Sequence, residues 1–245
     1  MIAIQHFDVG ERRIAYRLRA GASPILVFLP GYASDMEGAK ALALDAFAER
    51  RGFAMLRFDY SGTGSSGGKF EDGTLAFWLE EALAVVDRLT DGPLIVIGSS
   101  MGGWVALHVA LQRSNRVAAL VGIAAAPDFT NWGFPEHLQQ RLSSGETLRR
   151  TSPYGGEQVT TAEFWSSGQL LLLLNQELAI HCPVRLLHGE DDSDVPLDIA
   201  FRTMRAIRSA DVQLNVLKGG GHRLSEPHEI DAILRTVAGL LEPAP

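Results

Sequence analysis

Short apolar runs alternate with segments of helical periodicity along most of this chain, and this alternation limits the possible folds more than any other feature. The runs lack the polar–apolar alternation of a strand with one face in water, so they predict strands that are buried on both faces. They cover residues 24–31, 53–60, 93–99, 117–126, 182–190 and 212–220. Helical periodicity appears at residues 38–52, 74–89, 101–114, 196–207 and 226–242. Strands and helices in this order predict an α/β protein with a mostly parallel sheet.

A β-hairpin is predicted at the start of the chain, where alternating residues 2–9 and 13–18 flank Gly10. Together with the six apolar runs, this gives about eight strands flanked by helices. The length of 245 residues suits one domain, and we assign residues 1–245 to it.

Composition narrows the class of protein and its partners. The net charge of −7 argues against a nucleic-acid partner, because nucleic-acid-binding proteins carry a basic surface stripe. Cys182 is the single cysteine, so no disulfide framework and no cysteine-based zinc site is expected. The amino-terminal residues show no leader pattern, and no apolar run reaches the roughly 20 residues that span a bilayer. We therefore expect a cytoplasmic protein without stable membrane insertion; no particular oligomeric state is predicted.

Residues 129–181 interrupt the regular alternation. These residues contain no clear strand, and a segment of this length inside a compact fold is usually a functional insertion. We expect a small helical lid here. Its large apolar side chains suggest an apolar acyl pocket, although such residues also commonly attach a lid to the domain. The candidate substrate-binding residues are Trp132, Phe134, Phe164 and Trp165.

Ser100 is the candidate nucleophile. Gly98–Gly102 matches the pattern G-x-S-x-G, and a predicted strand enters it while a predicted helix leaves it. The sharp turn between the two would lift the hydroxyl above the sheet. A second match at Gly64–Gly68 lacks this context, because its strand has already ended and more loop follows. We interpret Ser66 as a loop residue.

The glycine-rich segment Gly62–Gly67 matches the dinucleotide fingerprint G-x-G-x-x-G. The third glycine should open a helix where the pyrophosphate binds, but more loop follows here. We therefore expect no nucleotide cofactor, and the histidines show no metal-ligand spacing that would predict a metal.

A serine hydroxyl needs a neighbouring base, and the base needs an acid to orient it. The order Ser…Asp…His is the order expected for a nucleophile on a strand–turn–helix elbow. Asp191, Asp192 and Asp194 follow a late strand, and chemistry alone does not choose among them. His222 follows the last strand, at the sheet edge where open α/β sheets keep their sites, and is the predicted base. His228 begins the last helix and is expected to face solvent or support that helix.

The negative oxygen that forms during acyl transfer needs two fixed donors. One predicted donor is the backbone N–H of Met101, at the start of the helix after the nucleophile. The other is the backbone N–H of Tyr32, in the loop after the first long strand, where Gly31 allows close approach.

Taken together, these motifs resemble those of the α/β-hydrolase superfamily, in particular its palmitoyl-protein thioesterase branch. The resemblance covers nearly the whole chain apart from the insertion. Many relatives have a histidine where this chain has Pro30, although the thioesterase branch is similar here. The similar segments are residues 30–32, 57–68, 98–104, 185–196 and 221–223.

The resemblance implies an α/β-hydrolase fold and a catalytic triad of Ser100, Asp192 and His222. It favours Asp192 over its neighbours by position in the loop. It also implies a serine hydrolase that cleaves acyl thioesters or carboxylic esters, on a small ester or an S-acylated protein. Removal of palmitate from proteins is one such activity. Hydrolysis of acyl-glucuronides or of general carboxylic esters is the enzymatic alternative, and a non-catalytic ligand-binding protein is the alternative from another class.

Overall fold

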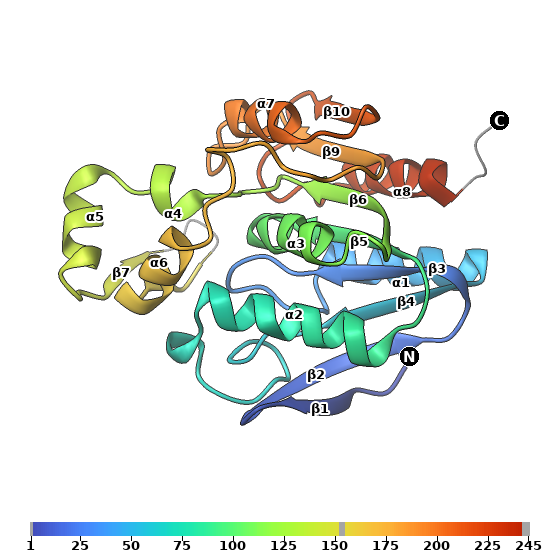
Figure 1. Cartoon of the computed structure of the whole chain (residues 1–245), viewed down its shortest axis with the longest axis horizontal. Helices are drawn as coiled ribbons and strands as arrows, with labels where there is room; N and C mark the ends of the chain where they lie inside the picture. Colours follow the sequence, from blue (N-terminus) through green and yellow to red (C-terminus); the bar gives the residue numbers. More distant parts are fainter. Residues whose placement is uncertain (1, 152–154, 242–245) are drawn as a thin grey trace.

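The computed structural model describes residues 2–151 and 155–241. Eight strands form one sheet in the order β1-β2-β4-β3-β5-β6-β9-β10. The β1–β2 and β2–β4 pairs are antiparallel, and the other pairs are parallel (Figure 1). This confirms the predicted fold class. The strands are β1 (Gln5–Val9), β2 (Arg12–Arg19), β3 (Ala22–Leu29), β4 (Phe53–Phe58), β5 (Leu94–Ser99), β6 (Val117–Ile123), β9 (Val184–Gly189) and β10 (Val212–Leu217).

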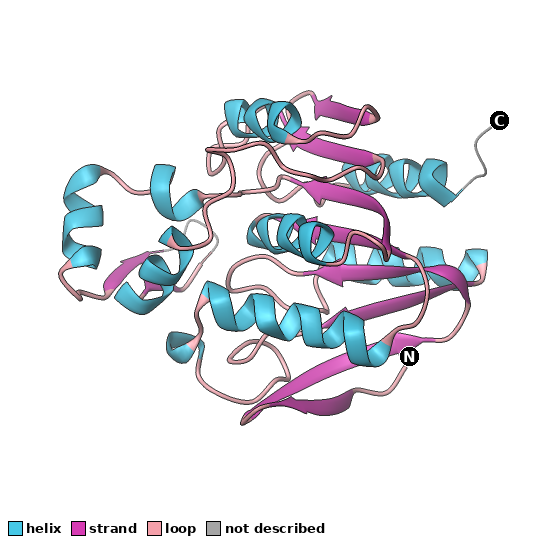
Figure 2. Ribbon diagram, viewed as in Figure 1, coloured by secondary structure: helices cyan, strands magenta, loops and turns pink. Residues whose placement is uncertain are grey.

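Helices cover both faces of this sheet (Figure 2). Val27 in β3 packs in the cluster that contains α2 and α3, whereas its neighbours Leu26 and Phe28 pack in the cluster that contains α1 and α8. Consecutive strand residues point to opposite faces, so an unbroken apolar run is what this two-sided packing requires. The flanking helices are α1 (Ala39–Arg51), α2 (Leu75–Leu89), α3 (Met101–Gln112), α7 (Leu197–Ala206) and α8 (Pro227–Leu241).

The segment between β6 and β9 projects from the carboxyl edge of the sheet, at the left of Figure 1. It contains α4 (Phe129–Trp132), α5 (Glu136–Ser143) and α6 (Ala162–Gln169). It also contains an antiparallel pair, β7 (Leu148–Thr151) and β8 (Glu157–Thr160). The expectation of no strand here was wrong, because β7 and β8 are only four residues long and β7 is exposed after its first residue. A lid function for this segment stays a prediction.

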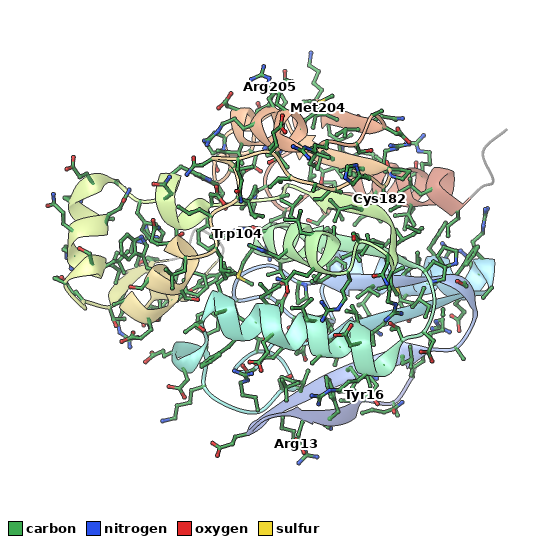
Figure 3. The ribbon with its side chains drawn as sticks, in the orientation of Figure 1. Arg13, Tyr16, Trp104, Cys182, Met204 and Arg205 are labelled. Carbon is green, nitrogen blue, oxygen red and sulfur yellow. The ribbon has the colours of Figure 1, made fainter. Side chains whose placement is uncertain are left out.

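Contacts from α3 attach the insertion to the domain. Trp104, labelled in Figure 3, donates from its indole N–H to the carbonyl of Leu171 at 3.1 Å. His108, one turn further along α3, donates to the same carbonyl at 2.9 Å. Because α3 begins directly after Ser100, the helix that follows the candidate nucleophile also anchors the turn after α6, where the insertion returns to the domain. Within the described residues, no helix has the length and apolar character needed to cross a membrane.

Candidate active site

Ser100 lies on the tight turn between β5 and α3 and has a backbone φ of +54° and ψ of −120°. A non-glycine residue held with positive φ costs about 1–3 kcal/mol, so the surrounding packing must impose this conformation. The packing is backbone against backbone. A Cβ on Gly102 would lie 2.1 Å from the carbonyl oxygen of Leu29, and one on Gly98 would lie 2.2 Å from that of Gly102. Both glycines of the motif are therefore required by the close approach of β3, β5 and α3.

The structure brings Ser100, His222 and Asp192 together from three separate segments. Ser100 Oγ lies 3.0 Å from His222 Nε2, and His222 Nδ1 lies 2.9 Å from Asp192 Oδ2. His222 follows β10, and Asp192 lies in the loop after β9. Since β5, β9 and β10 run parallel, their carboxyl ends meet at one edge and place the three side chains there.

The Asp192 carboxylate is fully buried and firmly held. Its Oδ1 accepts backbone N–H groups of Asp194 and Val195, both at 2.9 Å. His188, buried in β9, donates to the carbonyl of Val195 at 2.9 Å and so fixes the same loop. Burial alone would raise the pKa of Asp192, but the hydrogen bond and charge of His222, with the two N–H groups, outweigh it and lower that pKa. The carboxylate therefore remains ionised and orients the imidazole.

The two candidate oxyanion donors belong to segments that lie next to Ser100. Met101 is the first residue of α3, where the N–H groups of a helix have no partner within that helix. Tyr32 follows Gly31, whose backbone passes so close that a Cβ there would lie 3.3 Å from the Cβ of Ser100. The Tyr32 hydroxyl donates to the carbonyl of Val159, which ties this loop to the insertion. Burial raises the pKa of that phenol, so it stays a donor.

Comparison with known proteins identifies the family of this chain. The sequence pattern of the alpha/beta hydrolase fold family matches residues 24–166. Human mitochondrial palmitoyl-protein thioesterase ABHD10 is 37% identical over 234 residues, which are 94% of this chain and 76% of the relative. The chain belongs to the α/β-hydrolase family.

Two solved structures share the fold of this hydrolase. Alpha/beta hydrolase domain-containing protein 10 from mouse superimposes with a TM-score of 0.90 and 34% identity, covering 98% of both chains. A proposed hydrolase from Agrobacterium vitis S4 superimposes with a TM-score of 0.93 and 36% identity, covering 99% of this chain and 100% of the other. The expected family resemblance is thus confirmed.

The expected cytoplasmic location is wrong. The curated relatives from human and cattle are both named mitochondrial. The expectation rested on cysteine usage and on the amino-terminal residues, and neither feature encodes a compartment directly.

A cavity of about 960 Å³ opens at Ser100 and His222. Of the four residues predicted to bind substrate, Trp132 and Phe134 line it. Phe164 and Trp165 do not, and the prediction for these two is corrected. Phe164 is 1% exposed and packs against Tyr32, Trp78 and Phe129. Phe164 therefore attaches the insertion to the domain. Trp165 donates to the carbonyl of Thr130 and packs beside Phe134, so its side chain joins elements within the insertion.

The rival motif matches have structural roles. Ser66 Oγ donates to the carbonyl of Asp59 and accepts the N–H of Ala15, which holds the glycine-rich loop against β2. The Gly62 N–H donates to the Gly67 carbonyl, so the loop closes on itself. In residues 2–151 and 155–241, no three His, Cys, Asp or Glu side chains are grouped as a metal site would require.

Sequence reasoning missed the cationic residues of the cavity. Lys40, Arg150 and Arg223 all line it. Arg223 directly follows the candidate base, and Lys40 lies in the first turn of the helix after the candidate oxyanion loop. Their positions in the chain could have indicated this, because a residue next to His222 or next to the Tyr32 loop lies near the candidate site.

Proposed function

We propose that this hydrolase cleaves acyl thioesters or carboxylic esters through an acyl-enzyme formed on Ser100. The observation that carries the proposal is the continuous hydrogen-bonded chain from Ser100 Oγ through His222 to buried Asp192. A serine hydroxyl becomes a competent nucleophile when a base within hydrogen-bond reach accepts its proton, and this chain provides that base.

The reaction proceeds in two halves. Ser100 Oγ attacks the acyl carbonyl as its proton passes to His222 Nε2, and Asp192 stabilises the imidazolium. The N–H groups of Met101 and Tyr32 bind the negative oxygen, and each such donor lowers the barrier by about 3 kcal/mol. His222 then donates its proton to the leaving oxygen or sulfur. Water, deprotonated by His222, attacks the acyl-enzyme; the bond from the acyl carbon to Ser100 Oγ then breaks, His222 returns the proton to Oγ, and the acid is released.

Two substrate classes follow from different observations. S-acylated proteins, with removal of palmitate, are suggested by the name of the human relative and by the aromatic side chains of Phe129, Trp132 and Phe134 in the cavity. Small carboxylic esters are favoured by the charged residues that share that cavity, because a purely hydrocarbon ligand would not need them.

A substrate panel distinguishes these classes. Turnover is measured with long- and short-chain acyl thioesters, simple carboxylic esters and an acyl-glucuronide, with Ser100→Ala as the control. We expect turnover of at least one class, with loss of turnover in Ser100→Ala. Retained turnover in that variant would contradict the proposed nucleophile. Turnover of short acyl chains alone would contradict the proposed depalmitoylation activity and would leave the proposed esterase activity standing.

A further inference from the structure

Lys40 and Arg223 form a cationic wall on one side of the cavity at Ser100. The Lys40 ammonium donates to the backbone carbonyl of Arg223, so the helix α1 residue and the residue after His222 are held together. The Lys40 side chain is thereby held against the backbone of Arg223, and both cationic residues line one cavity in a protein whose net charge is −7.

The surroundings of Lys40 leave its charge largely uncompensated. Among the residues that the structure describes, no carboxylate forms an ion pair with Lys40. Burial, and then the charge of Arg223, lower the pKa of Lys40 to about 8, while Glu229 opposes this in part. The first turn of α1 carries no acidic residue, so the positive end of the helix dipole adds to the same potential. Keeping a buried ammonium without a carboxylate partner is unfavourable for the folded protein. Such an arrangement is typical of a functional site, here one that binds an anion.

The acidic residues of the cavity have other roles. Asp35 accepts the backbone N–H of Glu37 at 2.8 Å, and Glu157 is paired with Arg149 at 2.6 Å. Asp194 lies in the loop that carries Asp192, and its N–H donates to that carboxylate. None of the three forms an ion pair with Lys40.

The chemistry of the reaction determines which part of a substrate meets this wall. His222 Nε2 must donate its proton to the leaving oxygen or sulfur, so the leaving group lies beside His222. Arg223 is the next residue in the chain, and Lys40 is bonded to it. Because Lys40 and Arg223 line the same cavity as His222, we assign the leaving group to their side of it and the acyl oxygen to the N–H groups of Tyr32 and Met101.

We propose that Lys40 and Arg223 bind an anionic group, a carboxylate or a phosphate, carried by the alcohol or thiol that this enzyme releases. This inference rests on the proposed esterase function and names the leaving-group chemistry that it would select. Charge-assisted hydrogen bonds from Lys40 and Arg223 to this anion would form when the ester binds. They would favour the charged ester over an uncharged ester of the same shape.

The first experiment compares matched esters with the wild-type protein. 4-Carboxyphenyl butyrate and 4-carbamoylphenyl butyrate share the acyl group and differ in charge. Butyryl-coenzyme A and S-butyryl-N-acetylcysteamine form a pair of thioesters. Only the first has phosphate groups on its leaving thiol, so this pair tests a phosphate as the bound anion. We expect the charged member of at least one pair to have a kcat/KM higher by about tenfold, the size of one charge-assisted hydrogen bond. Equal values in both pairs would overturn the proposal.

Variants then test which residues cause the preference for the charged ester. We expect Lys40→Met and Arg223→Gln each to reduce the charged-to-neutral ratio of kcat/KM towards one, and Lys40→Arg to retain most of it. Lys69→Met removes the same charge from a residue outside the cavity lining and should keep the wild-type ratio. An unchanged ratio in both Lys40→Met and Arg223→Gln would contradict the assignment to these residues.

Two further measurements distinguish failure of the anion-binding proposal from failure of the proposed esterase function. If a variant does not fold, inhibition of the wild-type protein by 4-hydroxybenzoate and by 4-hydroxybenzamide gives the same comparison, and the carboxylate should inhibit more strongly. Absence of turnover with every ester, together with absence of covalent labelling at Ser100, would contradict the proposed function itself. Turnover without charge preference contradicts only the anion subsite.

Discussion

At the scale of single residues, the site depends on one buried carboxylate. Asp192 is the only one of the three loop aspartates that His222 contacts in the described structure, and both of its oxygens accept hydrogen bonds. Asp191 is exposed and offers its backbone N–H to the carbonyl of Gly220 instead. This difference decides which neighbour can orient the imidazole.

We expect Asp192→Asn to lower kcat by roughly a thousand- to ten-thousandfold, because an amide no longer fixes the imidazole tautomer or stabilises the imidazolium. Steady-state kinetics with any accepted ester checks this. Asp191→Asn, one residue away and exposed, should keep nearly full activity. Equal losses in the two variants would mean that Asp192 has no special role.

The same carboxylate should make stability depend on pH. Its folded-state pKa lies below the usual value of 3.8, so its contribution is present above pH 3.8 and is lost as the pH falls through the lower folded-state value. The difference in unfolding free energy between wild type and Asp192→Asn, measured with urea, should therefore be larger at pH 6 than at pH 3. A difference that stays constant or grows towards acid would show that the carboxylate is not held in its ionised form.

At the scale of elements, the junction of β3, β5 and α3 creates the strained nucleophile. The carbonyl of Leu29 lies where a side chain on Gly102 would begin, and Ser100 donates its backbone N–H to Ile123 of β6 at 2.9 Å. The helix therefore packs on the strands through backbone atoms, and the conformation of Ser100 follows from that packing.

Gly102→Ala should lower the unfolding free energy by about 1–3 kcal/mol, because the new methyl group overpacks the junction. It should also reduce kcat by more than tenfold, since Ser100 moves with the helix. Gly239→Ala is the matched control, because that exposed glycine in α8 has no heavy atom within 4 Å of the added Cβ. It should raise stability by about 0.5–1 kcal/mol. Chemical denaturation of both variants tests the argument, and a Gly102→Ala protein as stable as wild type would refute it.

At the scale of the whole molecule, the sequence was most informative where local pattern and global packing agree. The apolar runs of β3, β5 and β6 are buried on both faces, so their pattern reveals the sheet directly. The positions of Ser100 and His222 followed from the same pattern, because each lies just beyond a strand. The choice of Asp192 among three aspartates needed the resemblance, since burial of one side chain in a loop has no local pattern.

Features of the insertion and the cavity could not be predicted in this way. An apolar side chain such as Phe164 looks the same in a sequence whether it lines a pocket or packs in a core, and only the tertiary contacts place it in the core. The short strand β7 is mostly exposed and lacks an apolar run. Lys40 reaches the cavity only because α1 begins beside the loop that carries Tyr32.

The most direct test of the central claim is the site of covalent modification by a fluorophosphonate, located by mass spectrometry of the digested protein. We expect a single adduct on the peptide that contains Ser100, lost in Ser100→Ala and formed much more slowly in His222→Ala. An adduct on another residue, or undiminished labelling of Ser100→Ala, would contradict that claim.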